Sequence, residues 1–144
     1  MSLNEWELSE KPAVEHLKSL GYEYKHGTEI APNGDDPERE SLSDVVLRDR
    51  LRTKLRELNP NIPDEAIEQA VAELLGFNSP KIIKNNRNFH EKLVGGVHVE
   101  YEEGDEQVGD FVDIIDYDEP ENNDFLVVNQ FEIQIGDNTK RIPD

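Results

Sequence analysis

The sequence predicts a mixed α+β fold, with helices first and a mainly antiparallel or mixed sheet after them. Two observations lead to this fold class. In the first two thirds of the chain, apolar residues recur at helical spacing between prolines and glycines that would end a helix. From residue 97 on, apolar and polar residues alternate, and β-branched and aromatic residues become frequent. At 144 residues the chain fits one domain that can bury a core without a metal or disulfides.

Four helices are expected, over residues 8–20, 41–59, 64–75 and 81–93. The first has Ser9 as a plausible N-cap, Pro12 in its first turn and Gly21 at its end. Residues 22–24 alternate like the start of a short strand. Residues 27–37 are rich in Gly, Pro, Asn and Asp, which predicts a loop.

The strands are expected in the second half of the chain. Residues 97–101 and 111–117 form a hairpin around an acidic turn at residues 102–107. Residues 125–135 are the strongest strand, apolar on both faces at first and alternating later, so we expect this strand to enter a core and then leave it. A short turn at residues 136–138 follows it.

The composition limits the possible functions. A formal net charge of -18, from 33 acidic and 15 basic residues, argues against a broad nucleic-acid-binding surface. The acidity is explained either by solubility or by mimicry of a DNA phosphate array. The absence of cysteine excludes disulfides and thiolate zinc sites, and the four histidines lack metal-binding spacing. No signal peptide or membrane-length apolar run is present, which favours a cytoplasmic protein without a membrane partner.

One basic stretch stands out in the expected second helix, for which Ser41 or Ser43 is the N-cap. Its members are Arg48, Arg50, Arg52, Lys54 and Arg56. This stretch could face DNA. Alternatively, its side chains pair with Asp44, Asp49 and Glu57 on a solvated face, or contact another part of a larger protein.

A set of motifs gives the chain a family resemblance. Residues 120–131 read PENNDFLVVNQF, and residues 141–144 read RIPD after a hairpin-length gap. Further matching segments are residues 14–24, 43–52, 58–60 and 85–90. Together they resemble the amino-terminal domain of the restriction (R) subunit of type I restriction-modification enzymes. The resemblance implies that residues 1–144 are the first part of that endonuclease domain, with a partial restriction-endonuclease-like fold of the PD-(D/E)xK superfamily.

The resemblance implies two site residues. Asp144 would be the first acidic residue of the PD-(D/E)xK motif, and Glu10, on the first helix, would join it as a catalytic ligand of Mg²⁺. Carboxylates suit this chemistry because the metal ion must neutralise the scissile phosphate and activate a water. Two plainer interpretations stay open. Glu10 could only complement the helix dipole, and Asp144 could be a terminal residue without a role.

In this family the intact enzyme cleaves double-stranded DNA after ATP-driven translocation, in complex with modification and specificity subunits. The chain has no Walker-type phosphate-binding motif, so ATP would bind to a motor domain downstream. Two other functions remain possible from the sequence. One is an acidic decoy that imitates DNA, and the other is a non-catalytic docking module that uses the helices between Ser41 and Leu93.

We expect the 144-residue chain alone to lack Mg²⁺-dependent nuclease activity. The resemblance places the second acidic residue and the lysine of the motif on a strand beyond Asp144, so the metal site is incomplete. Incubation of the purified chain with supercoiled plasmid and Mg²⁺ measures this directly. Nicking or linearisation that stops when the metal is chelated would contradict the expectation.

Overall fold

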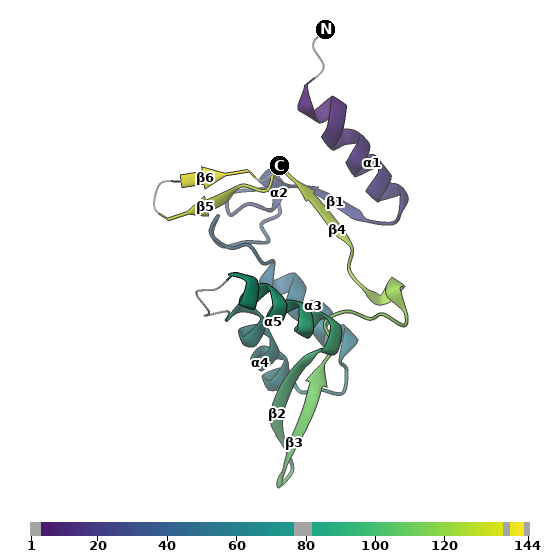
Figure 1. Cartoon of the computed structure of the whole chain (residues 1–144), viewed down its shortest axis with the longest axis vertical. Helices are drawn as coiled ribbons and strands as arrows, with labels where there is room; N and C mark the ends of the chain where they lie inside the picture. The colour runs from purple at the N-terminus through teal and green to yellow at the C-terminus, as the bar shows by residue number, and fades with distance from the viewer. Residues whose placement is uncertain (1–3, 77–81, 137–138, 143–144) are drawn as a thin grey trace. The chain divides into compact units, whose positions relative to one another are not determined.

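The computed structural model describes residues 4–76, 82–136 and 139–142. The fold is α+β, as the sequence predicts, and it is consistent with a partial restriction-endonuclease-like fold. The chain divides into two compact units (Figure 1). The terminal unit contains Met1–Leu47 and Phe125–Asp144, and the central unit contains Arg48–Asp124.

The central unit contains three helices and a β-hairpin, with α4 packed between α3 and the hairpin. Its helices are α3 (Arg48–Leu58), α4 (Asp64–Leu75) and α5 (Ile82–Gly95), and its strands are β2 (Val97–Glu103) and β3 (Glu106–Val112). Helix α4 matches its predicted bounds, and its apolar positions, spaced at three and four residues, pack against α3 and β2. The buried core is formed by Leu55, Ala66, Ile67, Ala70, Val71, Leu74, Val97, Val99 and Val112.

The start predicted for the second helix is wrong, because α3 begins only at Arg48. Residues before it form a local turn instead of a helical cap. The Ser41 amide donates to Asp44 Oδ2 at 3.0 Å, and the Ser43 amide donates to Ser41 Oγ at 3.1 Å. The Leu42 carbonyl accepts the Gln134 amide at 2.9 Å, so these backbone groups find partners outside any helix.

The predicted hairpin exists, but its return strand was placed too late. Strand β3 covers Glu106–Val112 rather than residues 111–117. The expected acidic turn shrinks to two residues, because Gly104 takes a positive φ of 65° and allows pairing to continue to Glu103 and Glu106. The alternation predicted for the outgoing strand is confirmed, with Val97 and Val99 buried.

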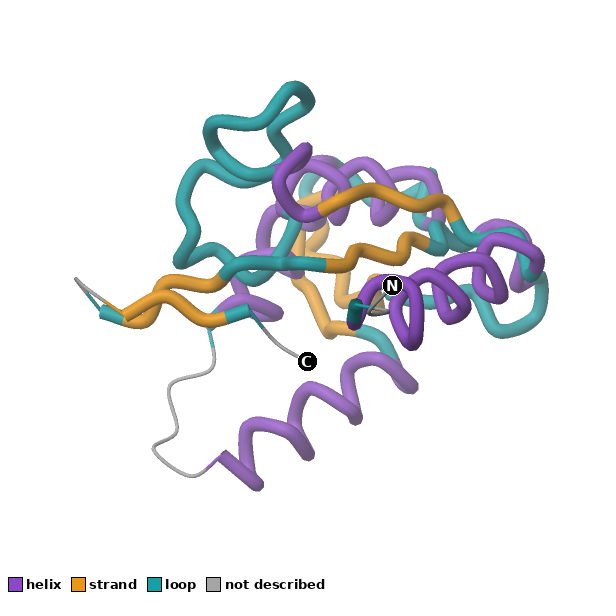
Figure 2. The backbone as a smooth tube through the Cα atoms, turned by 90° about the horizontal axis from the view of Figure 1, so that it is seen from above, coloured by secondary structure: helices purple, strands orange, loops and turns teal. Residues whose placement is uncertain are grey.

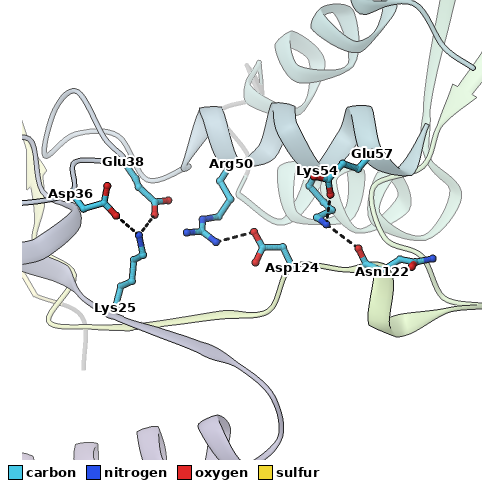
Figure 3. Close-up of polar contacts among 8 residues, drawn as sticks. All are labelled: Lys25, Asp36, Glu38, Arg50, Lys54, Glu57, Asn122 and Asp124. Atoms are coloured by element: carbon cyan, nitrogen blue, oxygen red, sulfur yellow. Dashed lines mark hydrogen bonds and ion pairs between the residues drawn. The ribbon is translucent and has the colours of Figure 1, made fainter. Parts of the chain in front are cut away.

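The basic side chains of α3 are largely engaged by carboxylates and carbonyl oxygens (Figure 3). Arg50 contacts Asp124 at 2.9 Å, and Lys54 donates to Glu57 and to the Asn122 carbonyl at 2.5 and 3.0 Å. Further pairs join Arg52 to Asp49 and Glu68, and Arg56 to Asp64 and Glu68. The predicted pairing with Asp49 and Glu57 is thus confirmed, and additional partners come from α4 and from the segment before β4.

The terminal unit contains short elements from both ends of the chain. They are a π-helical turn at Trp6–Glu10, α1 (Lys11–Ser19), β1 (Glu23–His26), α2 (Gly27–Ile30), β4 (Leu126–Asn129), β5 (Ile133–Ile135) and β6 (Thr139–Arg141). Strands β1 and β4 pair in parallel, and β5 and β6 form an antiparallel hairpin (Figure 1). Figure 2 shows the strands in orange and the helices in purple. The described strands form three two-stranded sheets rather than one sheet, and one of them includes β1 from the first 30 residues.

The predicted cap of the first helix is wrong, whereas its end is confirmed. The helical segment starts earlier, where Asn4 Oδ1 accepts the Glu7 amide at 3.0 Å. Ser9 Oγ donates back to the Glu5 carbonyl at 3.0 Å, as expected of a serine inside a helix. Gly21 ends α1 with a φ of 96°.

Two other predictions for this unit need correction. The loop expected at residues 27–37 begins with one helical turn, α2, because the His26 imidazole accepts the Thr28 amide as a cap. The strand predicted over residues 125–135 is divided into β4 and β5. The break lies at Gln130, whose φ of 53° is incompatible with a continuous strand.

A buried arginine holds the chain after this break. Arg39 is 5% exposed, and its guanidinium donates to the carbonyls of Leu42 and Glu132 at 2.7 and 2.8 Å. The same group lies 4.0 Å from the centre of the Phe131 ring, a cation–π contact. Burial lowers the Arg39 pKa. This contact set fixes residues 131–132 against the loop that precedes α3 in sequence.

Candidate functional site

The Glu10 carboxylate lies between two amide side chains from the end of β4. Asn129 Nδ2 donates to Glu10 Oε2 at 2.9 Å, and Gln130 Nε2 donates to the other oxygen, Oε1. Glu10 is the last residue of the π-helical turn before α1, a wider turn of a kind often found at functional sites. Glu10 thus has side-chain partners of its own, and because it also precedes the first residue of α1, the helix-dipole interpretation stays open beside the functional one.

Tyr24 on β1 adds a third member to this cluster. Its hydroxyl donates to Asn129 Oδ1 at 2.8 Å. The contact follows from the parallel register, in which Tyr24 is opposite Val127 and alternate residues share a face, so Asn129 lies diagonally within reach. Burial raises the Tyr24 pKa, and the negative charge of Glu10 raises it further.

Gly27 and Gln130 approach each other where β1 and β4 end. A Cβ added to Gly27 would lie 2.0 Å from the Gln130 carbonyl oxygen and 2.9 Å from that of Asn129. No side chain can occupy that space. The glycine therefore lets the chain turn at Gln130 immediately after the last paired residues, His26 and Asn129.

A pocket of about 570 Å³ adjoins the cluster through Gln130. It is lined by Gly27, Thr28, Glu29, Ala31, Asn33, Gly34, Asp35, Leu42, Gln130, Glu132 and Lys140. Its charged lining contains three carboxylates and one lysine, and Lys140 is paired with Glu132 at 3.2 Å. A pocket of this charge attracts cations and disfavours a phosphate group, unless a metal ion changes the balance.

The chemistry of Glu10 suits a hard divalent cation. Within the described residues, no lysine or arginine forms an ion pair with Glu10, and its hydrogen-bond donors are neutral amides. Mg²⁺ is usually held by one or two carboxylates together with water, so Glu10 fits as one ligand. The described part of the chain contains no group of three His, Asp or Glu side chains that could hold a metal ion without further residues.

Asp144, the second predicted metal ligand, lies outside the described residues, and so does Pro143 before it. Its proximity to Glu10 stays a prediction. The part of the motif that the structure describes is the hairpin leading to it, in which β5 and β6 pair as the hairpin-length gap between residues 131 and 141 predicts.

One Glu-x-Lys triplet occurs within the chain, at residues 23–25 of β1, and sequence analysis overlooked it. Lys25 Nζ contacts Asp36 at 2.5 Å and Glu38 at 2.8 Å, which hold the Lys25 pKa above its ordinary value (Figure 3). Tyr24 lies on the opposite face of the strand and reaches the Glu10 cluster. The triplet therefore directs its lysine away from the Glu10 cluster.

Sequence analysis did not assign a role to Tyr24, Asn129 or Gln130. The available signal was a pair of amide residues directly after the apolar run of β4, where a strand would more often continue with apolar or alternating residues. Their partner Glu10 lies 119 residues from Asn129 in sequence. Such a contact depends on the pairing of β1 with β4, which the sequence pattern did not reveal.

Comparisons with known proteins identify the family. The family described as "Type I restriction enzyme R protein N terminus" matches residues 2–144. The chain is 36% identical over 132 residues to a protein of Methanocaldococcus jannaschii named as the endonuclease subunit of the type I restriction enzyme MjaIXP. It is 35% identical over 142 residues to the type I restriction enzyme HindI endonuclease subunit of Haemophilus influenzae.

These alignments cover 92% and 99% of the chain but only 12% and 13% of the two relatives. No solved structure matches the chain. The matches define the class of protein as the amino-terminal region of a type I restriction enzyme subunit. The chain belongs to the type I restriction enzyme R protein N-terminus family. None of the described helices is long and apolar enough to cross a membrane.

We expect Gly27→Ala to destabilise the terminal unit by about 1–3 kcal/mol, because the added methyl group overlaps the Gln130 backbone. The fluorescence of Trp6, the one tryptophan of the chain, reports on this unit during thermal unfolding. Gly95→Ala is the matched control, because its Cβ would meet nothing within 4 Å. Equal unfolding midpoints for Gly27→Ala and the unmodified chain would contradict the account of the strand ends.

Proposed function

We propose that this chain forms the first part of the DNA-cleavage site of a type I restriction R subunit. In this proposal Glu10 and Asp144 bind Mg²⁺ in the intact enzyme, which cleaves double-stranded DNA. The observation that carries the proposal is the setting of Glu10. The family resemblance alone points to this residue, and its carboxylate is held at the end of β4 by two neutral donors.

The bound metal ion would polarise the scissile phosphate and lower the pKa of an attacking water. The chain's own contribution is to hold carboxylate oxygens in place and to leave their charge available to the ion. Family membership supports the rest of the proposal, because both relatives are named as endonuclease subunits of type I restriction enzymes.

The acidity of the chain limits how it can meet DNA. The carboxylates around the pocket oppose phosphate binding, and most basic side chains of α3 have acidic partners. We therefore assign the main grip on DNA to other parts of the complex, including the modification and specificity subunits. ATP would act through a motor domain outside this chain, and translocation would bring DNA to the site.

The proposal is tested with Glu10→Gln in the assembled restriction enzyme whose R subunit carries this chain. The substitution keeps the size of the side chain but removes the negative charge that binds the metal. We expect the rate of DNA cleavage to fall by about 100-fold or more, since even partners outside the ligand shell contribute 10–100-fold. The rate of DNA-stimulated ATP hydrolysis should stay the same, because the motor is separate.

Glu15→Gln is the matched control, since Glu15 is an exposed glutamate five residues further along the same helical segment. It should cleave DNA at the unmodified rate. Asp144→Asn should reproduce the loss seen for Glu10→Gln. Cleavage by Glu10→Gln at the rate of the Glu15→Gln control would overturn the proposed role of Glu10.

A further inference from the structure

The two amides that hold Glu10 belong to consecutive residues, and each binds a different carboxylate oxygen. We propose that Asn129 and Gln130 are positioning residues that fix the plane of the Glu10 carboxylate for a divalent cation, and that Tyr24 fixes the amide of Asn129. The proposal rests on the function proposed above, in which Glu10 is a metal ligand. It assigns these three residues a role that neither the motif nor the matches assign.

Neutral donors suit this role better than charged ones. A carboxylate oxygen can accept about two hydrogen bonds, so one amide on each oxygen leaves a lone pair on each for a cation. A lysine or arginine in the same place would neutralise Glu10 and repel the metal. The amides therefore remove the rotational freedom of the carboxylate without reducing its charge.

Tyr24 holds the end of the Asn129 amide that faces away from Glu10. Its hydroxyl donates to Asn129 Oδ1 while Asn129 Nδ2 donates to Glu10. If the amide were turned over, its oxygen would face the Glu10 carboxylate, and two acceptors would meet. The Glu10 carboxylate, which can only accept, therefore sets the orientation of this amide, and the Tyr24 hydroxyl, which can donate or accept, anchors its far end.

The backbone directs Gln130 toward Glu10. Gln130 has a φ of 53°, a conformation uncommon for residues other than glycine, asparagine and aspartate. Residues held in such conformations cluster at functional sites. The absence of a side chain at Gly27 makes room for this turn, since a Cβ there would lie 2.0 Å from the Gln130 carbonyl oxygen. As a result, the side-chain amides of two successive residues, Asn129 and Gln130, both donate to the Glu10 carboxylate at the end of β4.

The decisive variants remove a donor while preserving shape. Gln130→Met keeps the length of the side chain and the backbone requirement, and Tyr24→Phe removes one oxygen atom. In the assembled enzyme, we expect Gln130→Met to raise the Mg²⁺ concentration for half-maximal DNA cleavage by about 10–100-fold. Tyr24→Phe should raise it by about 10-fold. Saturating Mg²⁺ should restore most of the cleavage rate in both variants.

Gln107→Met is the matched control. Gln107 Nε2 also donates to a glutamate carboxylate, that of Glu100 at 3.3 Å, but on the exposed β2–β3 hairpin. Loss of this hydrogen-bond donor in Gln107→Met should leave unchanged the Mg²⁺ concentration for half-maximal DNA cleavage. If Gln130 had a purely structural role, Gln130→Met would lower the thermal unfolding midpoint and leave the Mg²⁺ requirement the same. The two roles are therefore separable.

A second readout does not depend on cleavage. In the 144-residue chain, Mn²⁺ should broaden the side-chain amide signals of Asn129 in nuclear magnetic resonance spectra. The broadening should disappear in Glu10→Gln, persist in Glu15→Gln and require about 10-fold more Mn²⁺ in Tyr24→Phe.

The possible outcomes separate this inference from the proposed function. If Gln130→Met and Tyr24→Phe keep the unmodified Mg²⁺ and Mn²⁺ requirements while Glu10→Gln loses cleavage and broadening, the positioning role is refuted and the metal role of Glu10 stands. If Glu10→Gln keeps both the DNA cleavage rate and the Mn²⁺-induced broadening, the proposed function itself is wrong. Should Gln130→Met unfold, Tyr24→Phe decides the matter alone.

Discussion

The parallel pairing of β1 with β4 is the constraint on which the terminal unit depends. It joins residues 23–26 to residues 126–129, about 100 positions apart in sequence. The register places Tyr24 within reach of Asn129 and sets Gly27 against Gln130. A slip of one residue would turn every side chain of a strand to the other face and separate these groups. The Tyr22 and Phe125 rings, with centres 5.2 Å apart, support the register at the start of the pair.

The acidity of the chain is compatible with a role in DNA cleavage because different parts of an enzyme can carry different charges. A net charge of -18 would weaken any binding of DNA by this chain alone. Carboxylates are nevertheless what a Mg²⁺ site requires, and the ion itself supplies positive charge where the phosphate must come. On the proposed function, the chain contributes metal ligands rather than affinity for DNA. Family membership favours this interpretation over a free-standing DNA mimic.

Local patterns predicted the elements whose stability is local. The apolar spacing of α4, the alternation of β2 and the end of α1 at Gly21 were all readable from the sequence. Some predictions were wrong because of local side-chain contacts, such as the Asn4 and His26 caps, and others because a distant contact contributes. Residues 41–47 carry helix-forming apolar spacing, but hydrogen bonds to Asp44 and Gln134 hold them in a turn. The apolar run through residues 125–135 breaks because of the left-handed turn at Gln130.

The candidate site was only partly predictable for the same reason. Glu10 came from the family resemblance, since neither charge nor spacing distinguishes it among 33 acidic residues. Its amide partners required knowledge of the β1–β4 pairing, which links segments from opposite ends of the sequence. Tyr24 in turn required the register of that pair.

On the proposed function, Glu10 is a ligand of a divalent cation. Anomalous X-ray scattering from crystals of the intact R subunit grown with Mn²⁺ can locate that ion. We expect an anomalous peak at about 2.0–2.2 Å from a Glu10 carboxylate oxygen, with Asn129 and Gln130 still donating to Glu10. An occupied Mn²⁺ site in the nuclease domain that excludes Glu10 would show that Glu10 is not a metal ligand.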